Sequence, residues 1–303
     1  MSLYKVTAAL DMIHHATILA PSKINIHLHV LDKRADGYHN LMTLFQMVSL
    51  YDELLCTVEP EGRGGCSIEN GVTARVEDDL IYKAWLAFSK ASGMEFSLRV
   101  RVNKGIPIQA GLGGGSSDGA AVLELLNAVF GHPLSGEKLL ALAGKLGSDA
   151  AFFLNSPSAY AEGRGEILTH IDVAPKFWVL IINLPTPMNT TLAYRLLDEN
   201  GYTNGAGPGR EEIIRSYREK RPSEWPFFNS FARLYRKDPA YASVIEELRL
   251  GGVDFFSLTG SGSAVFGVFQ DRKKAVEAYD AAAGRHQVWL VEPLELKPVT
   301  VLQ

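Results

Sequence analysis

The sequence predicts an α+β protein built from two domains, residues 1–173 and residues 174–303. The first observation is length, because 303 residues suffice for one large domain or two medium ones. The second is a first half in which alternating, strand-like segments are mixed with segments of helical spacing. The third is a restart of this pattern around Pro175, which places the domain boundary near Ala174.

The composition is that of an ordinary globular protein, with 47% hydrophobic and 21% charged residues. The formal net charge is -4 and the sequence pI is about 6.1, so the chain lacks the basic field of a nucleic-acid binder. An anionic ligand would therefore need local positive features, such as helix N-termini, single lysines or a metal ion. We expect a small-molecule ligand and no nucleic-acid partner, in a monomer or a homodimer.

No apolar run is long enough to span a membrane, and the first residues lack the compact apolar segment of a signal peptide. The two cysteines, Cys56 and Cys66, have a spacing typical of neither a zinc site nor a redox pair. We interpret them as free thiols in a reducing compartment. Together these features predict a cytoplasmic protein without a membrane partner.

In the first domain, the spacing of apolar residues predicts strands with helices set among them. Residues 18–31 alternate apolar and polar side chains as a strand does, and the Asp36-Gly37 pair marks a turn. Helical spacing appears at residues 79–91 and again from Ser117 to Phe130. The remaining expected elements are an apolar segment at 41–55, a strand at 98–102, a helix capped by Ser135 and ended by Gly147, and a hairpin at 159–171 turning at 163–165.

The second domain opens with an apolar strand at residues 177–183. Residues 185–226 are rich in Pro, Gly, Asn and charge, so we expect helices interrupted by loops there. Helical spacing returns at residues 238–250 and at 272–284. Between these helices lie a short strand, a glycine-rich turn and an apolar strand at 264–269, and a final strand closes the chain.

The strongest chemical signal is a glycine-rich turn between a strand and a helix, which runs from Gly111 to Gly115 and continues into Ser116 and Ser117. Glycines let the backbone approach a ligand closely, and a helix start offers unpaired N–H groups and the positive end of the helix dipole. The two serines could cap the helix, hold Mg²⁺, or both. The pattern therefore predicts a phosphate-binding site, with a tight turn that binds no ligand as the alternative.

This turn matches neither of the two common nucleotide-binding fingerprints. No Gly-Lys-Ser/Thr sequence follows at the Walker A spacing, and no acidic residue lies in strand context about twenty residues later. The chain also lacks a Gly-x-Ser-x-Gly elbow, a His-Glu-x-x-His pair and a Cys/His cluster. Hydrolase and zinc-enzyme chemistry consequently have little support.

Several polar residues have both a chemical and a structural interpretation. Lys23 lies on the first strand, where it is either functional or a solvent-facing lysine. Asp149 lies where one helix ends and an apolar segment begins, so it is either a functional carboxylate or an N-cap. Tyr38 and His39 follow the Asp-Gly turn, as a ligand clamp or as residues that pack on the core.

Two further patterns are weaker. His27 and His29 point to one face of the first strand, which makes a metal site conceivable, but the fixed zinc-ligand spacings are missing. The second glycine turn, residues 259–263, would supply flexible N–H donors beside a phosphate, and a plain hairpin turn explains it equally well.

Three blocks of the chain resemble, in order and at suitable distances, the three motifs of the galactokinase, homoserine kinase, mevalonate kinase and phosphomevalonate kinase (GHMP) superfamily. They are Pro-Ser-Lys-Ile-Asn at 21–25, Gly-Leu-Gly-Gly-Gly-Ser-Ser at 111–117 and Thr-Gly-Ser-Gly-Ser at 259–263. Residues 34–39, 147–153 and 161–168 narrow the resemblance to the branch that serves the non-mevalonate (methylerythritol phosphate) isoprenoid pathway. The resemblance covers most of the chain, from about Ile18 to Phe269.

The resemblance implies an ATP-dependent kinase for the 2-hydroxyl of 4-(cytidine 5′-diphospho)-2-C-methyl-D-erythritol. It implies a mixed α/β N-terminal domain with a left-handed crossover, a ferredoxin-like C-terminal domain, and an active site in the cleft between them. Mg²⁺ would accompany ATP, with Ser117 as a protein group that could contact it. The residues implied to wrap the ATP phosphates are Pro107, Ile108, Gln109, Ala110, Gly111, Leu112, Gly113, Gly114, Gly115, Ser116 and Ser117.

The same resemblance assigns roles to single side chains. Asp149 would be the general base or the carboxylate that orients the acceptor hydroxyl, with Lys23 as its partner. Tyr38 would stack on the cytosine and His39 would hydrogen-bond its edge. Asn25 would contact the substrate tail, and an aromatic residue after the loop at 185–190, Tyr194, would close the other face of the cytosine.

Two other functions stay open at this point. The first is a kinase of the same fold with a mevalonate- or homoserine-type acceptor, against which the Tyr38-His39 pair argues, because such an acceptor has no base to clamp. The second is a nucleotide-binding module without catalytic activity. The presence of both Lys23 and Asp149 argues against this second alternative.

Overall fold

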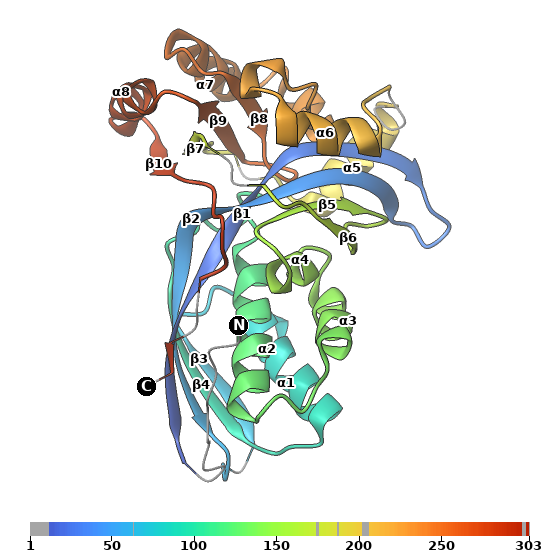
Figure 1. The fold of residues 1–303 in the computed structure, drawn as a ribbon, viewed down its shortest axis with the longest axis vertical. Coiled ribbons are helices and arrows are strands. Elements are labelled where there is room, and N and C mark those ends of the chain that lie inside the picture. The colour runs from blue at the N-terminus through green and yellow to red at the C-terminus, as the bar shows by residue number, and fades with distance from the viewer. Residues whose placement is uncertain are drawn as a thin grey trace.

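The computed structural model describes residues 12–62, 64–173, 176–186, 188–201 and 206–298, together with the backbone of 301–302. Two sheets lie one above the other in Figure 1, each with its own set of helices. The chain thus has the α+β architecture with two units that the sequence predicts. The described strands are β1 (His14–Lys33), β2 (His39–Glu59), β3 (Gly65–Glu69), β4 (Ser97–Asn103), β5 (Ser158–Glu162), β6 (Ile167–His170), β7 (Trp178–Asn183), β8 (Phe255–Leu258), β9 (Ala264–Phe269), β10 (Gln287–Val291) and β11 (Val301–Leu302).

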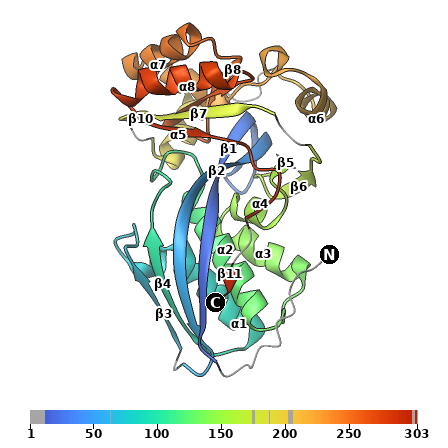
Figure 2. The ribbon, with the colours of Figure 1, turned by 60° about the vertical axis from the view of Figure 1, so that its left-hand side comes forward.

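The first sheet is built around the long antiparallel pair β1 and β2. Its strand order is β11-β1-β2-β4-β3, and β5 and β6 extend it from β2. β3 pairs with β4 in parallel, and the chain passes through a helix between them, so this is the crossover connection of the sheet. The helices of this unit all lie on one side of the sheet (Figures 1 and 2). They are α1 (Leu80–Ser92), α2 (Gly114–Val129), α3 (Gly136–Leu146) and α4 (Ala150–Leu154).

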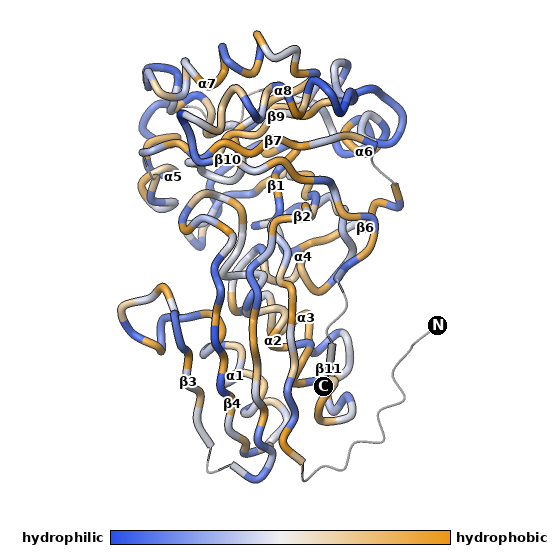
Figure 3. Tube along the Cα trace, turned by 90° about the vertical axis from the view of Figure 1, so that its left-hand side faces the viewer, coloured by the Kyte–Doolittle hydropathy of each residue, from blue (hydrophilic) through white to orange (hydrophobic). Residues whose placement is uncertain are grey.

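The second sheet is wholly antiparallel, with the order β10-β7-β9-β8. This is the four-stranded sheet expected for a ferredoxin-like unit. In Figure 3, β7 is coloured as hydrophobic along most of its length, and its residues 179–182 are buried, as suits a strand inside a covered sheet. The helices of this unit are α5 (Thr190–Glu199), α6 (Arg210–Glu219), α7 (Pro239–Leu250) and α8 (Arg272–Ala283), with short 3₁₀ turns at Pro222–Glu224 and Ser230–Tyr235. A further 3₁₀ turn, Val76–Asp78, precedes α1 in the first unit.

Besides the chain segment that connects them, the two units share packing contacts at both ends of the chain. The far ends of β1 and β2 reach up to α5 and α6 in Figure 1. At the other end of the chain, residues 292–298 run back down, where Leu294 N–H donates to Met47 O at 2.9 Å, and β11 pairs with β1. The last described residues therefore pack on the first sheet. The predicted boundary at Ala174 lies outside the described residues, and the division at 173/174 stays a prediction.

Most predicted elements lie where the sequence places them. Two differences are β3, which the sequence analysis does not predict, and the start of α2. That helix begins at Gly114 rather than at Ser117, because Gly113 adopts a left-handed conformation (φ 76°) and serves as its N-cap. Intrinsic propensity argues against helix in a glycine run. Packing overrides it here, since Ala110 and Leu112 on the preceding turn are buried in the core.

Candidate active site

The three sequence motifs, at residues 21–25, 111–117 and 259–263, meet at one backbone carbonyl. Gly111 O accepts a hydrogen bond from Lys23 Nζ at 2.9 Å and another from Thr259 Oγ1 at 3.0 Å. The amide of Gly260 donates to Asn25 Oδ1 at 2.9 Å, and Ala264 N–H donates to Ala110 O at 3.1 Å. Segments separated by more than two hundred residues are thereby fastened together where the two sheets meet.

The side chain of Asn25 connects several of these segments through hydrogen bonds. Its side-chain oxygen accepts from Lys23 Nζ at 2.7 Å as well as from Gly260, and its Nδ2 donates to Thr43 Oγ1 at 2.8 Å. The residue is 2% exposed, so these partners replace solvent and keep a buried amide satisfied. One Nδ2 hydrogen is left without a partner in the described part of the chain, and the expected contact with the substrate tail stays a prediction.

Lys23 and Asp149 form an ion pair. Lys23 Nζ lies 3.3 Å from Asp149 Oδ2, and the two side chains are 3% and 29% exposed, respectively. Asp149 occupies the N-cap position of α4, yet its side chain makes no capping hydrogen bond. The structural interpretation of this aspartate as a cap is therefore wrong, and its carboxylate instead faces a buried ammonium and the cavity.

The glycine turn leaves the start of α2 open. Gly113 has no side chain with which to cap the helix, and no other side chain does so in the described chain. The first N–H groups of α2 are thus free for an anion. Gly111 has a φ of 77°, and a Cβ built there would lie 2.1 Å from Thr259 O, so only glycine fits the motif junction.

The expectation that Ser116 or Ser117 caps the helix is wrong. Both residues lie inside the first turn of α2, after the cap residue Gly113. The Ser117 hydroxyl is buried and finds no hydrogen-bond partner among the described residues. Such a group is costly unless something else binds it.

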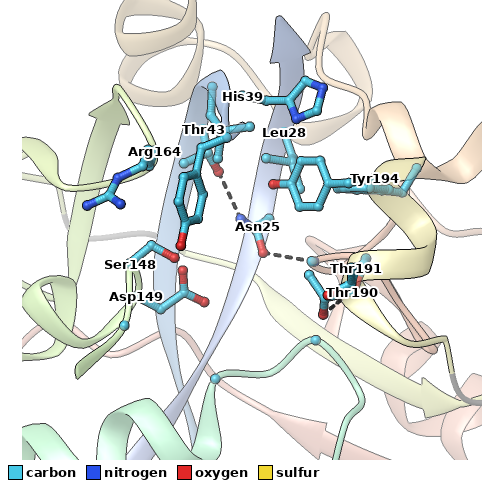
Figure 4. A pocket seen from close by; sticks show the side chains of 18 of the residues that line it. Asn25, Leu28, His39, Thr43, Ser148, Asp149, Arg164, Thr190, Thr191 and Tyr194 are labelled. Carbon is cyan, nitrogen blue, oxygen red and sulfur yellow. Dashed lines mark hydrogen bonds between the residues drawn. The ribbon is translucent and has the colours of Figure 1, made fainter. Parts of the chain in front are cut away.

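A cavity of about 740 Å³ opens above these groups. In Figure 4, Asp149, Ser148 and Arg164 lie on one side, Thr190, Thr191 and Tyr194 on the other, and Asn25 at the back. Of the residues predicted from the sequence, the cavity is lined by Lys23, Asn25, Tyr38, His39, Gly111, Gly113, Asp149 and Tyr194.

Three predicted residues with aromatic rings, Tyr38, His39 and Tyr194, line the cavity. Tyr38 is 57% exposed, and Arg164 lies over its ring at 4.8 Å. His39 is buried, and its ring is stacked on Tyr194, with 5.1 Å between centroids and 21° between planes. Burial raises the pKa of Tyr194, so its hydroxyl stays neutral. An exposed ring and a fixed imidazole therefore line the same cavity.

Sequence reasoning missed several charged residues that also line the cavity: Lys33, Lys145, Arg164, Arg195 and Asp198. Arg164 had one usable signal, since it occupies the tip of a predicted hairpin turn beside Glu162 and Glu166. Lys33 ends β1, and Lys145, Arg195 and Asp198 lie on helices, where their charge patterns resemble any solvated surface. The four cationic side chains of this set give a net acidic chain a local attraction for anions.

A buried charge cluster lies below the start of α2. Lys104 Nζ is ion-paired with Asp52 and lies 3.2 Å from Asp118 Oδ2. Asp52 Oδ1 also accepts from the N–H groups of Gly105 and Ile106 at 2.9 Å each. Burial raises the pKa of Asp118 to about 7, an effect that Lys104 opposes and Asp52 reinforces. The cluster ties β2, the end of β4 and α2 together.

The Asp118 carboxyl predicts a pH dependence of stability. An unfolded aspartate titrates near pH 4, so the folded state holds the extra proton between roughly pH 4 and 7 and loses stability as pH rises through that window. The slope is at most about 1.4 kcal/mol per pH unit. We expect unfolding free energies measured from pH 5 to 8 to decline more for the wild type than for Asp118→Asn. Parallel curves for the two proteins would contradict this, and the exposed Asp78→Asn is the matched control.

The histidines and cysteines noted in the sequence lie in surroundings that fit a structural role. His27 Nδ1 accepts from Phe228 N–H at 3.3 Å, and burial together with the neighbouring His29 lowers the pKa of His27 to about 3. Burial likewise raises the pKa of both thiols, Cys56 and Cys66, to about 12. Within the described ranges, no group of three His, Cys, Asp or Glu side chains could hold a metal ion. None of the helices there is long and apolar enough to cross a bilayer.

Comparison with known proteins finds two matching family domains. Residues 79–156 match the N-terminal domain of the GHMP kinases, and residues 221–286 match the GHMP kinase C-terminal domain. A 4-diphosphocytidyl-2-C-methyl-D-erythritol kinase of Geobacter metallireducens is 35% identical, over 86% of this chain and 91% of that protein. The Thermotoga maritima protein of the same name is 38% identical over 84% of this chain and 92% of its own length.

Solved structures agree with these sequence matches. A crystal structure of 4-(cytidine 5′-diphospho)-2C-methyl-D-erythritol kinase superposes with a TM-score of 0.77 at 33% identity, covering 91% of this chain and 98% of the other. A homoserine kinase from Cytophaga hutchinsonii superposes with a TM-score of 0.72 at 15% identity, covering 99% of this chain and 100% of the other, which shows a shared fold.

Proposed function

The chain belongs to the GHMP kinases and, within them, to the 4-diphosphocytidyl-2-C-methyl-D-erythritol kinase family, and we propose that it phosphorylates the 2-hydroxyl of 4-(cytidine 5′-diphospho)-2-C-methyl-D-erythritol with ATP. The observation that carries the catalytic part of this proposal is the Lys23–Asp149 ion pair, 3.3 Å long, beside an uncapped helix start in one cavity.

The ATP phosphates would lie against the glycine turn. The free N–H groups at the start of α2 and the positive end of its dipole favour phosphate oxygens, and glycine leaves room for close approach. The cavity contains Gly111 and Gly113 of the turn, and Gly260 of the second glycine motif, within the same wall. Both glycine motifs would therefore offer main-chain surface to the nucleotide.

Asp149 would act on the acceptor hydroxyl. The hydroxyl oxygen forms a bond to the γ-phosphorus while the bond from that phosphorus to the bridging oxygen of ADP breaks, and the hydroxyl proton passes to Asp149. Base assistance of this kind is worth roughly 10²–10⁴-fold in rate. Lys23, which also binds Gly111 O, would hold the carboxylate in position and add positive charge near the transferred group.

The cytidine would occupy the aromatic end of the cavity. The exposed ring of Tyr38 offers a stacking surface, and His39 offers a ring nitrogen to the edge of the base. Tyr194, which stacks on His39, would close this end, and Asn25 would contact the substrate tail through its remaining Nδ2 hydrogen. A cavity lined by an exposed aromatic ring and an imidazole suits a nucleotide-linked acceptor better than mevalonate or homoserine, which have no base.

Mg²⁺ would enter with ATP and supply positive charge to the phosphate oxygens. The buried Ser117 hydroxyl, which lacks a partner among the described residues, fits a contact with this ion or with a phosphate. Most of the ion's ligands would then be phosphate oxygens and water, which matches the habit of Mg²⁺ in kinase sites.

An acceptor panel tests the proposal. Purified protein is incubated with ATP and Mg²⁺ and with one of three acceptors: 4-(cytidine 5′-diphospho)-2-C-methyl-D-erythritol, mevalonate or homoserine. We expect ADP formation to depend on the cytidine-containing acceptor, with kcat/KM at least about 10³-fold higher than for the others, since unmatched polar groups reject analogues strongly. Equal turnover of mevalonate or homoserine would contradict the assignment.

A further inference from the structure

A network of charged and aromatic side chains holds His39 at the rim of the cavity. His39 opens β2, and its side chain is 3% exposed. Its Nε2 lies 2.7 Å from Asp198 Oδ1, and the second oxygen of that carboxylate accepts from Lys33 Nζ at 2.8 Å. Lys33 and His39 are register partners across the β1–β2 hairpin, whereas Asp198 comes from α5. One carboxylate thus connects the helix to both strands of the hairpin.

This network fixes the hydrogen-bonding character of the imidazole. An ionised carboxylate only accepts hydrogen bonds, so Nε2 must carry the hydrogen, and in the neutral ring Nδ1 then carries the lone pair. No protein partner for Nδ1 is found in the described ranges, and the ring lines the cavity. The stacked ring of Tyr194 holds the plane of the imidazole. Nδ1 is consequently a preset acceptor facing the ligand.

We propose that Asp198 is a positioning residue that makes the site select a 4-amino pyrimidine over a 4-oxo pyrimidine, acting through the Nδ1 of His39. This inference rests on the proposed function, in which His39 meets the edge of the cytidine base. Cytosine presents an N–H donor at its 4-position, whereas uracil presents a carbonyl oxygen that would face the lone pair of Nδ1. A buried acceptor left facing another acceptor loses a hydrogen bond and keeps its desolvation cost.

A purely structural role for Asp198 predicts a different outcome. The carboxylate is 26% exposed and Lys33 is 57% exposed, so their ion pair contributes little to stability. If Asp198 only anchored α5, its loss would weaken binding of cytidine and uridine nucleotides by the same factor. If it fixes the imidazole, its loss would change the ratio of the two affinities.

The test measures CMP and UMP binding by calorimetry for the wild type, Asp198→Asn and Asp198→Glu, in the full-length protein. We expect the wild type to prefer CMP by about 30-fold or more, as one unpaired buried acceptor requires. In Asp198→Asn the amide can donate to or accept from Nε2, so either tautomer is allowed and the preference falls about tenfold or more. Asp198→Glu restores a carboxylate and should keep most of the preference.

The matched control is Glu199→Gln on the same helix, where the side chain is 58% exposed and pairs with Arg195 on the helix surface. Its CMP preference should equal that of the wild type. A wild type that binds neither nucleotide, or fails to phosphorylate the cytidine-containing acceptor, would refute the proposed function itself. A wild type that prefers CMP, with an unchanged ratio in Asp198→Asn, would refute the role of Asp198 alone. If Asp198→Asn melts too early to be measured, a lost preference in Asp198→Glu overturns the proposal.

Discussion

Replacing Asp149 by asparagine is expected to lower kcat at least about 100-fold while leaving the affinity for ATP nearly unchanged. Asparagine has the same shape but cannot take the proton of the acceptor hydroxyl. The Asp149 carboxylate does not cap α4, so its loss removes no hydrogen bond that supports the fold. ATP would bind at the glycine turn and the start of α2, which the substitution does not alter. Steady-state turnover together with calorimetric ATP binding measures the two effects separately.

The matched control for this variant is Asp280→Asn on the exposed face of α8, away from the cavity. Its turnover and melting temperature should equal those of the wild type. Turnover in Asp149→Asn within a few-fold of the wild type would mean that another group activates the acceptor. Loss of ATP binding together with turnover would mean that the carboxylate supports the nucleotide site rather than the chemistry.

Lys23→Met is expected to lower kcat by roughly 10²–10³-fold, which is typical of losing one charged donor at a reacting oxygen. Methionine keeps the apolar stem of a residue that is 2% exposed, but it removes the ammonium that pairs with Asp149 and donates to Asn25 Oδ1 and Gly111 O. Hydrogen bonds that involve a charged group contribute about 1.5–3 kcal/mol each, so the melting temperature should also fall. The exposed Lys90→Met on α1 is the control, and it should change neither quantity.

Combining the two substitutions tests whether Lys23 and Asp149 act as a unit. Groups that serve one step are strongly non-additive, so the double variant should be barely slower than the slower single variant. Losses that multiply would contradict this, because they would mean that the two side chains assist turnover independently.

The order and extent of secondary structure were largely predictable because apolar periodicity reports directly on burial. β9 begins and ends as predicted, at Ala264 and Phe269, and every one of its side chains is buried. The start of α2 was not predictable. Its first residues are glycines, whose helical conformation depends on the packing of the preceding turn and on the left-handed Gly113 rather than on any local preference.

The candidate site was likewise predictable from the sequence only in part. Strand and turn context singled out the glycine turn and Lys23 as candidates, and the resemblance to the GHMP kinases added Asn25. The pairing of His39 with Asp198 was not found, because a charge pair separated by 159 residues leaves no periodic pattern in the sequence. Only the fold brings the end of α5 against the β1–β2 hairpin. That packing creates the contact between Asp198 and His39 that would fix which imidazole nitrogen carries the hydrogen.

A crystal structure of the protein with a non-hydrolysable ATP analogue, Mg²⁺ and the cytidine-diphospho acceptor tests the central claim most directly. We predict β- and γ-phosphate oxygens within hydrogen-bond distance of the N–H groups that open α2, and the acceptor hydroxyl within about 3 Å of Asp149. A nucleotide bound away from the turn at 111–117, or an acceptor hydroxyl out of reach of Asp149, would contradict the account.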